Sequence, residues 1–139
     1  MASAANSSTG SNTASELIAP FLKAWGSSAP EELIACYADH GLEYSDYAAH
    51  KLNMDKKAAV AFIRETFEEY SLVNYKAVSE HGTRDLCTLE VAFTLLAKKD
   101  TPFNKKGDIL ELPGVSLFKF DQDGKIVMQH DYYCIPIPQ

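Results

Sequence analysis

The chain has 139 residues, with 13 basic and 19 acidic side chains and a formal net charge of −6. This length fits a single domain, and the acidic balance without an extended basic cluster argues against nucleic acid and anionic membranes as partners. No apolar run approaches the ~20 residues that a membrane span needs. The start of the chain has neither the basic nor the apolar segment of a signal peptide, so a cytoplasmic location is expected.

The chain is predicted to begin with a flexible tail over residues 1–14, followed by one domain over residues 15–139. The tail is almost entirely Ser, Ala, Asn, Thr and Gly, which offer little apolar surface to offset the entropy of ordering. Ser15 is predicted to cap a helix whose apolar residues recur at helical spacing as far as Gly26. The segment PEELIACYAD, residues 30–39, predicts a second short helix with a proline in its first turn.

From residue 41 the pattern changes to the alternation of a strand, and GLEYSDYA places Leu42, Tyr44 and Asp46 on one side. Asp55 is predicted to cap a long helix that extends to Ser71 and carries an apolar stripe. Four β-rich segments follow, separated by polar stretches, over residues 72–80, 85–97, 109–120 and 125–137.

Helices therefore precede a run of antiparallel strands without βαβ alternation, which indicates the α+β class. A curved sheet folded over three helices would bury the apolar stripes. Cys36, Cys87 and Cys134 are an odd number of cysteines without CxxC spacing. They are interpreted as reduced packing residues, which excludes a disulfide framework and a zinc site, and no metal is expected.

Three stretches carry a family resemblance: the helix FLKAW, the segment PEELIACYADHGLEYSDYA and the hairpin SLFKFDQDGKIVMQHDYY. They resemble the SnoaL-like polyketide cyclases and isomerases of the nuclear transport factor two-like superfamily, over about residues 15–135. The resemblance implies a cone-shaped, barrel-like fold, in which a strongly curved, mainly antiparallel sheet is wrapped by three helices and encloses a pocket. It also implies a hydrophobic small-molecule substrate, a homodimer formed through the outer face of the sheet, and no cofactor.

Asp46 and Asp131 are the candidate catalytic residues. The resemblance places a proton-abstracting base near Asp46 on the first strand and an essential acid at Asp131 on the last strand. If both point into one apolar cavity they cannot both ionise easily, so one keeps its proton as an acid while the other serves as base. The alternative is that one or both are solvated acids at a strand edge.

Alternation along the last strand decides which neighbours accompany Asp131. The residues predicted to point inward with it are Val127, Gln129, Tyr133 and Ile135. Those predicted to face outward are Met128, His130, Tyr132 and Cys134. A one-residue bulge would exchange the two sets and make His130 the catalytic imidazole, as in the dehydratase relatives.

Five residues are predicted to bind substrate: Tyr44, Tyr133, Glu90, Gln129 and Trp25. Tyr44 could donate a hydrogen bond to a substrate oxygen, although a hydroxyl satisfied by a backbone carbonyl is an equal alternative. Glu90 interrupts an apolar run, and a carboxylate there must be exposed, paired or functional. Trp25 lies on a helix stripe and belongs either to the core or to the cavity wall.

This sequence departs from the relatives at two places, and each departure argues against one type of reaction. Phe21 and Ser116 stand where ketosteroid isomerase has its oxyanion hole, which argues against steroid-type isomerisation. Arg64 and Arg84 are not placed to bridge two inward acids as in limonene epoxide hydrolase. The sequence therefore predicts a cofactor-independent isomerase, cyclase or dehydratase that acts on a hydrophobic polyketide- or terpenoid-like molecule of secondary metabolism. The alternatives are a non-catalytic small-molecule-binding domain and a dimerisation module.

Overall fold

The computed structural model describes residues 13–135, so the predicted tail lies, up to residue 12, outside the described residues. Its elements in chain order are α2 (Ala14–Gly26), α3 (Pro30–Ile34), β1 (Glu43–Asp46), β2 (Lys51–Met54), α4 (Lys56–Glu69), β3 (Tyr70–Thr83), β4 (Leu86–Ala97), β5 (Ile109–Phe120) and β6 (Ile126–Tyr133). Within this part of the chain, no helix combines the length and the apolar character needed to cross a membrane.

Both long helices begin at side-chain caps. Thr13 caps α2: its hydroxyl accepts a hydrogen bond from the Glu16 amide (3.2 Å), and the Glu16 carboxylate accepts one from the Thr13 amide (2.9 Å). The predicted cap at Ser15 is therefore wrong, because the reciprocal pair needs a Glu or Gln three residues after the cap and only Thr13 has one. Asp55 caps α4 as predicted, accepting from the Ala58 amide at 2.9 Å.

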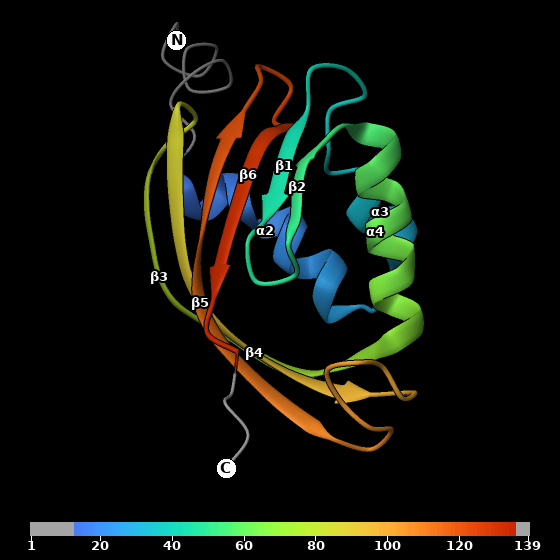
Figure 1. Ribbon diagram of the computed structural model, residues 1–139. Helices are drawn as coiled ribbons and strands as arrows, with labels where there is room; N and C mark the ends of the chain where they lie inside the picture. Colours follow the sequence, from blue (N-terminus) through green and yellow to red (C-terminus); the bar gives the residue numbers. More distant parts are fainter. Residues whose placement is uncertain (1–12, 136–139) are drawn as a thin grey trace, which may run out of the picture.

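The strands form one six-stranded sheet in the order β2-β1-β6-β5-β4-β3. Only β1 and β6 pair in parallel, and the other neighbours are antiparallel, so the predicted α+β class with a mainly antiparallel sheet is confirmed. Figure 1 shows the sheet bent around the helices but not closed, with β2 and β3 as its edges. Strand β2 was not predicted, since it is short, mostly exposed and contains a positive φ at Asn53.

The second helix is shorter than the predicted range 30–39 and ends at Ile34. Beyond it the chain pairs with the start of β6: the Ile126 amide donates to the Cys36 carbonyl (2.8 Å), and the Ala38 amide donates to the Ile126 carbonyl (2.9 Å). These strand-like hydrogen bonds replace the next helical turn.

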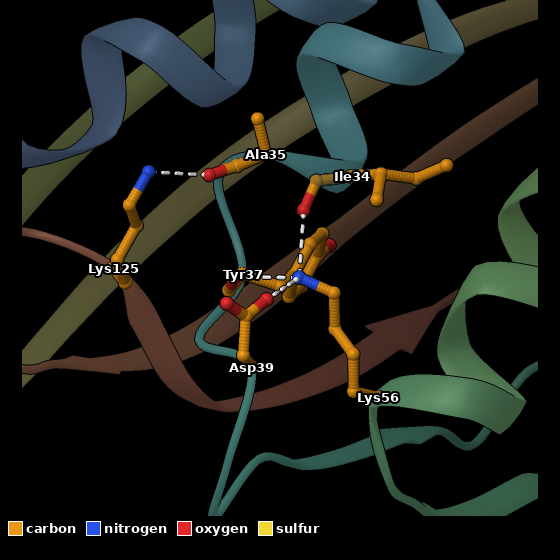
Figure 2. A network of polar contacts seen from close by, with 6 residues as sticks. All are labelled: Ile34, Ala35, Tyr37, Asp39, Lys56 and Lys125. Carbon is orange, nitrogen blue, oxygen red and sulfur yellow. Dashed lines mark hydrogen bonds and ion pairs between the residues drawn. The ribbon is translucent and has the colours of Figure 1, made fainter.

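Two lysine side chains hold the segment after α3, residues 35–39, by hydrogen bonds to its backbone and to Asp39, as Figure 2 shows. Lys56 Nζ donates to the Tyr37 carbonyl at 2.8 Å and to Asp39 Oδ1 at 3.1 Å. Lys125 Nζ donates to the Ala35 carbonyl at 2.7 Å. Charge-assisted hydrogen bonds of this kind are stronger than neutral ones. They fix the backbone of Tyr37, whose side chain points to the interior of the fold and is 3% exposed.

Gly114 lies opposite Tyr133 in the β5–β6 register, where the backbone of β6 is close to it. A Cβ at this position would lie 2.3 Å from the Tyr132 carbonyl oxygen and 2.3 Å from Tyr133 Cδ1. Side chains cannot be this close to backbone without moving it, so glycine is required for the approach of the two strands.

We expect Gly114→Ala to lower the free energy of unfolding by roughly 1–3 kcal/mol, because the new methyl group overpacks the β5–β6 pair. Gly26→Ala is the control: its Cβ would lie 3.4 Å from Tyr75 Cε1, an ordinary contact. That variant should stay within about 0.5 kcal/mol of the wild type. Urea denaturation measures both, and equal stability of the two variants would contradict the assignment.

Candidate active site

A cavity of about 230 Å³ lies inside the bend of the sheet. Its apolar wall includes Phe21, Trp25, Phe62, Phe93 and Leu112, and its polar lining includes Tyr37, Tyr44, Asp46, Gln129, Asp131 and Tyr133. The volume is a little below the ~300–1,000 Å³ of many small-molecule sites, which suits a compact ligand. The interior is thus not plugged by side chains, as a pure dimerisation module would require.

Asp46 on β1 and Asp131 on β6 are direct partners in the parallel pair. Their side chains leave the same face of neighbouring strands, which lie about 4.7–4.9 Å apart. Both carboxyl groups are buried, with Asp46 9% and Asp131 2% exposed, and both line the cavity. The fold therefore brings the two candidate acids together at one polar end of an apolar cavity.

Three side chains donate hydrogen bonds to Asp131. Gln129 Nε2 donates to Oδ1 (2.8 Å) and Oδ2 (3.1 Å), and the Tyr44 hydroxyl donates to Oδ2 (2.8 Å). Ser116 Oγ donates to Oδ1 at 2.7 Å. A buried carboxyl group needs such partners, since an unpaired one would lose its hydration without compensation. Asp131 is consequently held in one orientation.

Two further hydroxyl groups extend this network. The Tyr37 hydroxyl donates to Gln129 Oε1 at 2.6 Å, which turns the amide nitrogen of Gln129 toward Asp131. The Tyr133 hydroxyl lies 2.9 Å from Ser116 Oγ, and either oxygen can be the donor. Tyr37 and Ser116 were not predicted as site residues. The available signal for Ser116 was its small polar side chain between the apolar Val115 and Leu117.

Burial, and after it the charge of Asp46, raise the pKa of Asp131 to about 7. The hydrogen bonds from Ser116, Gln129 and Tyr44 oppose this rise. Burial also raises the pKa of Asp46, whereas hydrogen bonds from the backbone amides of Ala49 and Ala48 lower it. Two neighbouring carboxyl groups in a poorly hydrated place share protons in this way. Below about pH 7, Asp131 therefore keeps a proton.

Burial likewise raises the pKa of Tyr37, Tyr44 and Tyr133 well above the ordinary value of a phenol, and the nearby Asp131 adds to the shift. All three phenols are neutral in the physiological range. They can therefore donate hydrogen bonds to a carboxylate or to an oxygen of a bound molecule.

Glu90 was predicted to bind substrate, and the structure contradicts this placement. It is exposed on the outer face of β4 and accepts a 3.3 Å hydrogen bond from Ser79. Its neighbours Leu89 (0% exposed) and Val91 (1% exposed) take the inward positions, and alternation sends Glu90 outward. Trp25, in contrast, lines the cavity and stacks on Phe67 with ring centroids 5.1 Å apart.

The alternative register, with His130 in the cavity, is not the one in the structure. Pairing between β5 and β6 runs without a shift through Gln129, His130 and Asp131, so His130 lies on the opposite face. There its Nε2 is 2.8 Å from Glu43 Oε2, and its ring meets the edge of Tyr47. His130 is thus part of the outer surface.

A bulge does occur earlier in β6 and corrects one inward position. The register shifts between Lys119 and Phe120, so that Phe120 pairs with Ile126. Ile126, 1% exposed, takes the inner position predicted for Val127, which is only half-buried. Ile135 lines the cavity although it is 48% exposed, which places it at the mouth.

Neither arginine lines the cavity: Arg64 pairs with Glu31 on the surface, and Arg84 donates to the carbonyl of Asp121 in the turn before β6. An Asp-Arg-Asp arrangement is therefore not built from them. In the part of the chain that the structure describes, no three His, Cys, Asp or Glu side chains gather closely enough to hold a metal ion.

No family model matches the chain, but several known proteins are similar to it in sequence or in fold. The cyclase aurE of Calcarisporium arbuscula is 27% identical over 112 residues, covering 81% of this chain and 80% of that protein. A Catenulispora acidiphila protein with a ketosteroid isomerase-like fold has 18% identity and a TM-score of 0.68, covering 85% of each chain. A proposed SnoaL-like polyketide cyclase from Shewanella denitrificans has 20% identity and a TM-score of 0.68, covering 85% of this chain and 88% of that chain. The predicted fold and the resemblance to SnoaL-like cyclases are confirmed.

The raised pKa of Asp131 makes the stability of the fold depend on pH. Between its ordinary value of 3.8 and about 7, the folded protein keeps a proton that the unfolded chain has released. The contribution of Asp131 to stability is therefore present at low pH and lost as the pH rises through about 7. Asn at this position cannot titrate. We expect Asp131→Asn to gain stability relative to the wild type by up to a few kcal/mol between about pH 5 and about pH 8, since each pKa unit is worth ~1.4 kcal/mol.

Urea denaturation of both proteins at the two pH values measures this difference. Comparing the two proteins at each pH cancels the titration of most other groups. A stability difference that is the same at both pH values would show that Asp131 titrates normally in the fold.

Proposed function

We propose that this protein is a cofactor-independent acid–base enzyme that isomerises, cyclises or dehydrates a hydrophobic, carbonyl-bearing molecule of the polyketide or terpenoid type. The observation that carries the proposal is the pair Asp46 and Asp131, buried side by side at the polar end of an apolar cavity. The similarity to a protein described as a cyclase supports it.

The environments of the two carboxyl groups suggest their roles. Asp131, whose pKa burial raises to about 7, would supply a proton as general acid, and the more exposed Asp46 would be the general base. Asp46 removes a proton from the carbon next to a carbonyl group. The electron pair of that C–H bond forms a C=C bond, and the π pair of the carbonyl moves onto its oxygen, which receives the proton supplied by Asp131.

One proton thus passes from Asp131 to the substrate while another passes from the substrate to Asp46. The pair carries a single negative charge before and after the step, so no extra charge has to be buried during the reaction. The reverse transfers, at a different carbon, complete an isomerisation. The same enol can instead attack a second carbonyl group, which closes a ring, or expel a β-hydroxyl group as water. In either case the enol hydroxyl returns its proton to Asp131, and the proton on Asp46 goes to the second carbonyl oxygen or to the leaving hydroxyl group.

The apolar wall would hold the hydrocarbon part of the substrate and keep water away from the acids, which strengthens their electrostatic interactions. Trp25, Phe62 and Phe93 supply aromatic surface to this wall. A cytoplasmic, reducing location is part of the same proposal, since Cys36 and Cys87 are unpaired thiols.

Proton abstraction can be tested without the natural substrate. The probe is 2-tetralone, a compact bicyclic ketone with acidic hydrogens next to its carbonyl group, and NMR in D₂O follows the exchange of these hydrogens for deuterium. We expect the wild type to accelerate exchange. Asp46→Asn and Asp131→Asn should each slow it by roughly 10²- to 10⁴-fold, the usual contribution of one acid or base.

Glu90→Gln is the matched control, because it neutralises an exposed acid on the outer face of the sheet and should leave the exchange rate unchanged. Binding of the ketone without accelerated exchange would instead favour a non-catalytic small-molecule-binding domain. Full exchange activity in Asp131→Asn would end the assignment of Asp131.

We also propose that two copies associate through the outer face of the sheet. Tyr47 and Tyr132 stack there with ring centroids 4.8 Å apart, yet they remain 41% and 46% exposed. Exposed aromatic surface of this kind is common in protein interfaces. Light scattering after size-exclusion chromatography should give about twice the chain mass of 15.3 kDa, and a species of single-chain mass would refute the proposal.

A further inference from the structure

Asp131 has little freedom to touch a substrate directly. It is 2% exposed, and hydrogen bonds from Gln129, Ser116 and Tyr44 occupy both of its oxygens. Each carboxylate oxygen has about two acceptor positions. Oδ1 already receives two donors, from Ser116 and Gln129. A proton that leaves Asp131 therefore has to pass through one of its hydrogen-bond partners.

One of these hydrogen-bond partners, Ser116, connects Asp131 to a residue that lines the cavity. Ser116 Oγ lies 2.7 Å from Asp131 Oδ1, and on its other side lies 2.9 Å from the Tyr133 hydroxyl. Ser116 is fully buried, whereas Tyr133 is half-buried and lines the cavity. Carboxyl, serine hydroxyl and phenol thus form an unbroken chain of hydrogen bonds from the interior of the sheet to the cavity wall.

We propose that Ser116 and Tyr133 relay a proton from Asp131 to an oxygen of the substrate, and that Tyr133 is the catalytic residue that contacts this oxygen. The inference rests on the proposed function, because it describes how the buried acid reaches the substrate. Ser116 acts through Tyr133 and does not contact the substrate.

Each group in this series of hydrogen bonds gives up one proton and receives another, except the two ends. As the carbonyl oxygen of the substrate gains electron density, Tyr133 gives it the phenolic proton, and the Tyr133 oxygen takes the hydroxyl proton of Ser116. Ser116 in turn takes the proton of Asp131. The substrate oxygen is protonated, Asp131 becomes a carboxylate, and Ser116 and Tyr133 end as they began. This direction requires the proton of Asp131 to lie on Oδ1 and point to Ser116 Oγ, the reverse of the hydrogen bond that Ser116 donates to the carboxylate. The Ser116 hydroxyl then points to Tyr133, because either hydroxyl can be the donor in the bond between them.

Tyr44 is the other tyrosine through which the proton of Asp131 could reach the cavity, but its surroundings favour a positioning role. It is 5% exposed, its ring stacks on Tyr37 at 5.7 Å, and the edge of Phe62 meets it at 5.9 Å. Its hydroxyl is already used on Asp131 Oδ2. Tyr44 therefore holds Asp131 in place. Both tyrosines line the cavity, and Tyr133 is the less buried of the two.

The test uses the exchange of 2-tetralone in D₂O over a range of pD. Tyr133→Phe keeps the ring that packs against Phe93 at 6.0 Å, and Ser116→Ala removes one buried oxygen. Each should lower the maximal exchange rate by roughly 10²-fold, and the double variant should be no slower than either single one, because residues that act as a unit are not additive. Tyr132→Phe, on the outer face, is the control and should exchange at the wild-type rate.

The pD profile separates a relay from a merely structural role. If Ser116 only stabilised the carboxylate of Asp131, Ser116→Ala would move the profile to higher pD and keep the maximal rate, which would overturn the relay. Full exchange in Tyr133→Phe would overturn it as well, while the proposed function would stand. A wild type that binds the ketone without exchanging it would overturn both. Ser116→Ala disturbs no aromatic packing, so it decides the question even if Tyr133→Phe does not fold.

Discussion

The burial of two neighbouring carboxyl groups is the constraint on which the rest of the site depends. Removing a carboxylate from water costs several kcal/mol, and placing a second one beside it adds repulsion. The fold meets this cost in two ways: it leaves a proton on Asp131 below about pH 7, and it surrounds Asp131 with donors from Tyr44, Ser116 and Gln129. Such an arrangement is a poor way to gain stability, which fits the proposed role of the pair in proton transfer.

The donors come from separate parts of the chain, and each is supported in turn. Tyr37 orients the amide of Gln129, and Lys56 holds the backbone of Tyr37 from outside the cavity. Ser116 is the partner of Asp131 across the antiparallel β5–β6 pair. The parallel β1–β6 pair, the exception in this sheet, sets Asp46 beside Asp131. The sheet bends around the helices (Figure 1). The resulting cavity holds these groups together with apolar side chains of α2 and α4, such as Phe21 and Phe62.

The same strand that carries Asp131 serves two surfaces, which explains its unusual run of polar and aromatic residues. Gln129, Asp131 and Tyr133 belong to the cavity, whereas His130 and Tyr132 belong to the outer face. The cavity set is joined by hydrogen bonds and carries the proposed chemistry. The outer set joins Glu43 and Tyr47 in an exposed aromatic cluster, which fits an interaction surface.

Local pattern in the sequence was enough for the α+β class and for the long helix after Asp55, because helical spacing and strand alternation are local properties. The inward direction of Asp131 was predicted from the family resemblance. Local pattern gave the wrong helix cap at Ser15, because Thr13, two residues earlier, forms a capping pair with Glu16. It also gave the wrong inward residue at Val127, because a bulge changes the register there. Glu90 could not be placed from sequence, since its direction depends on which neighbours the core takes. Only the tertiary structure brought Tyr37, Ser116 and Asp46 to Asp131, because strand pairing joins residues that are far apart in the chain and no local signal records such pairing.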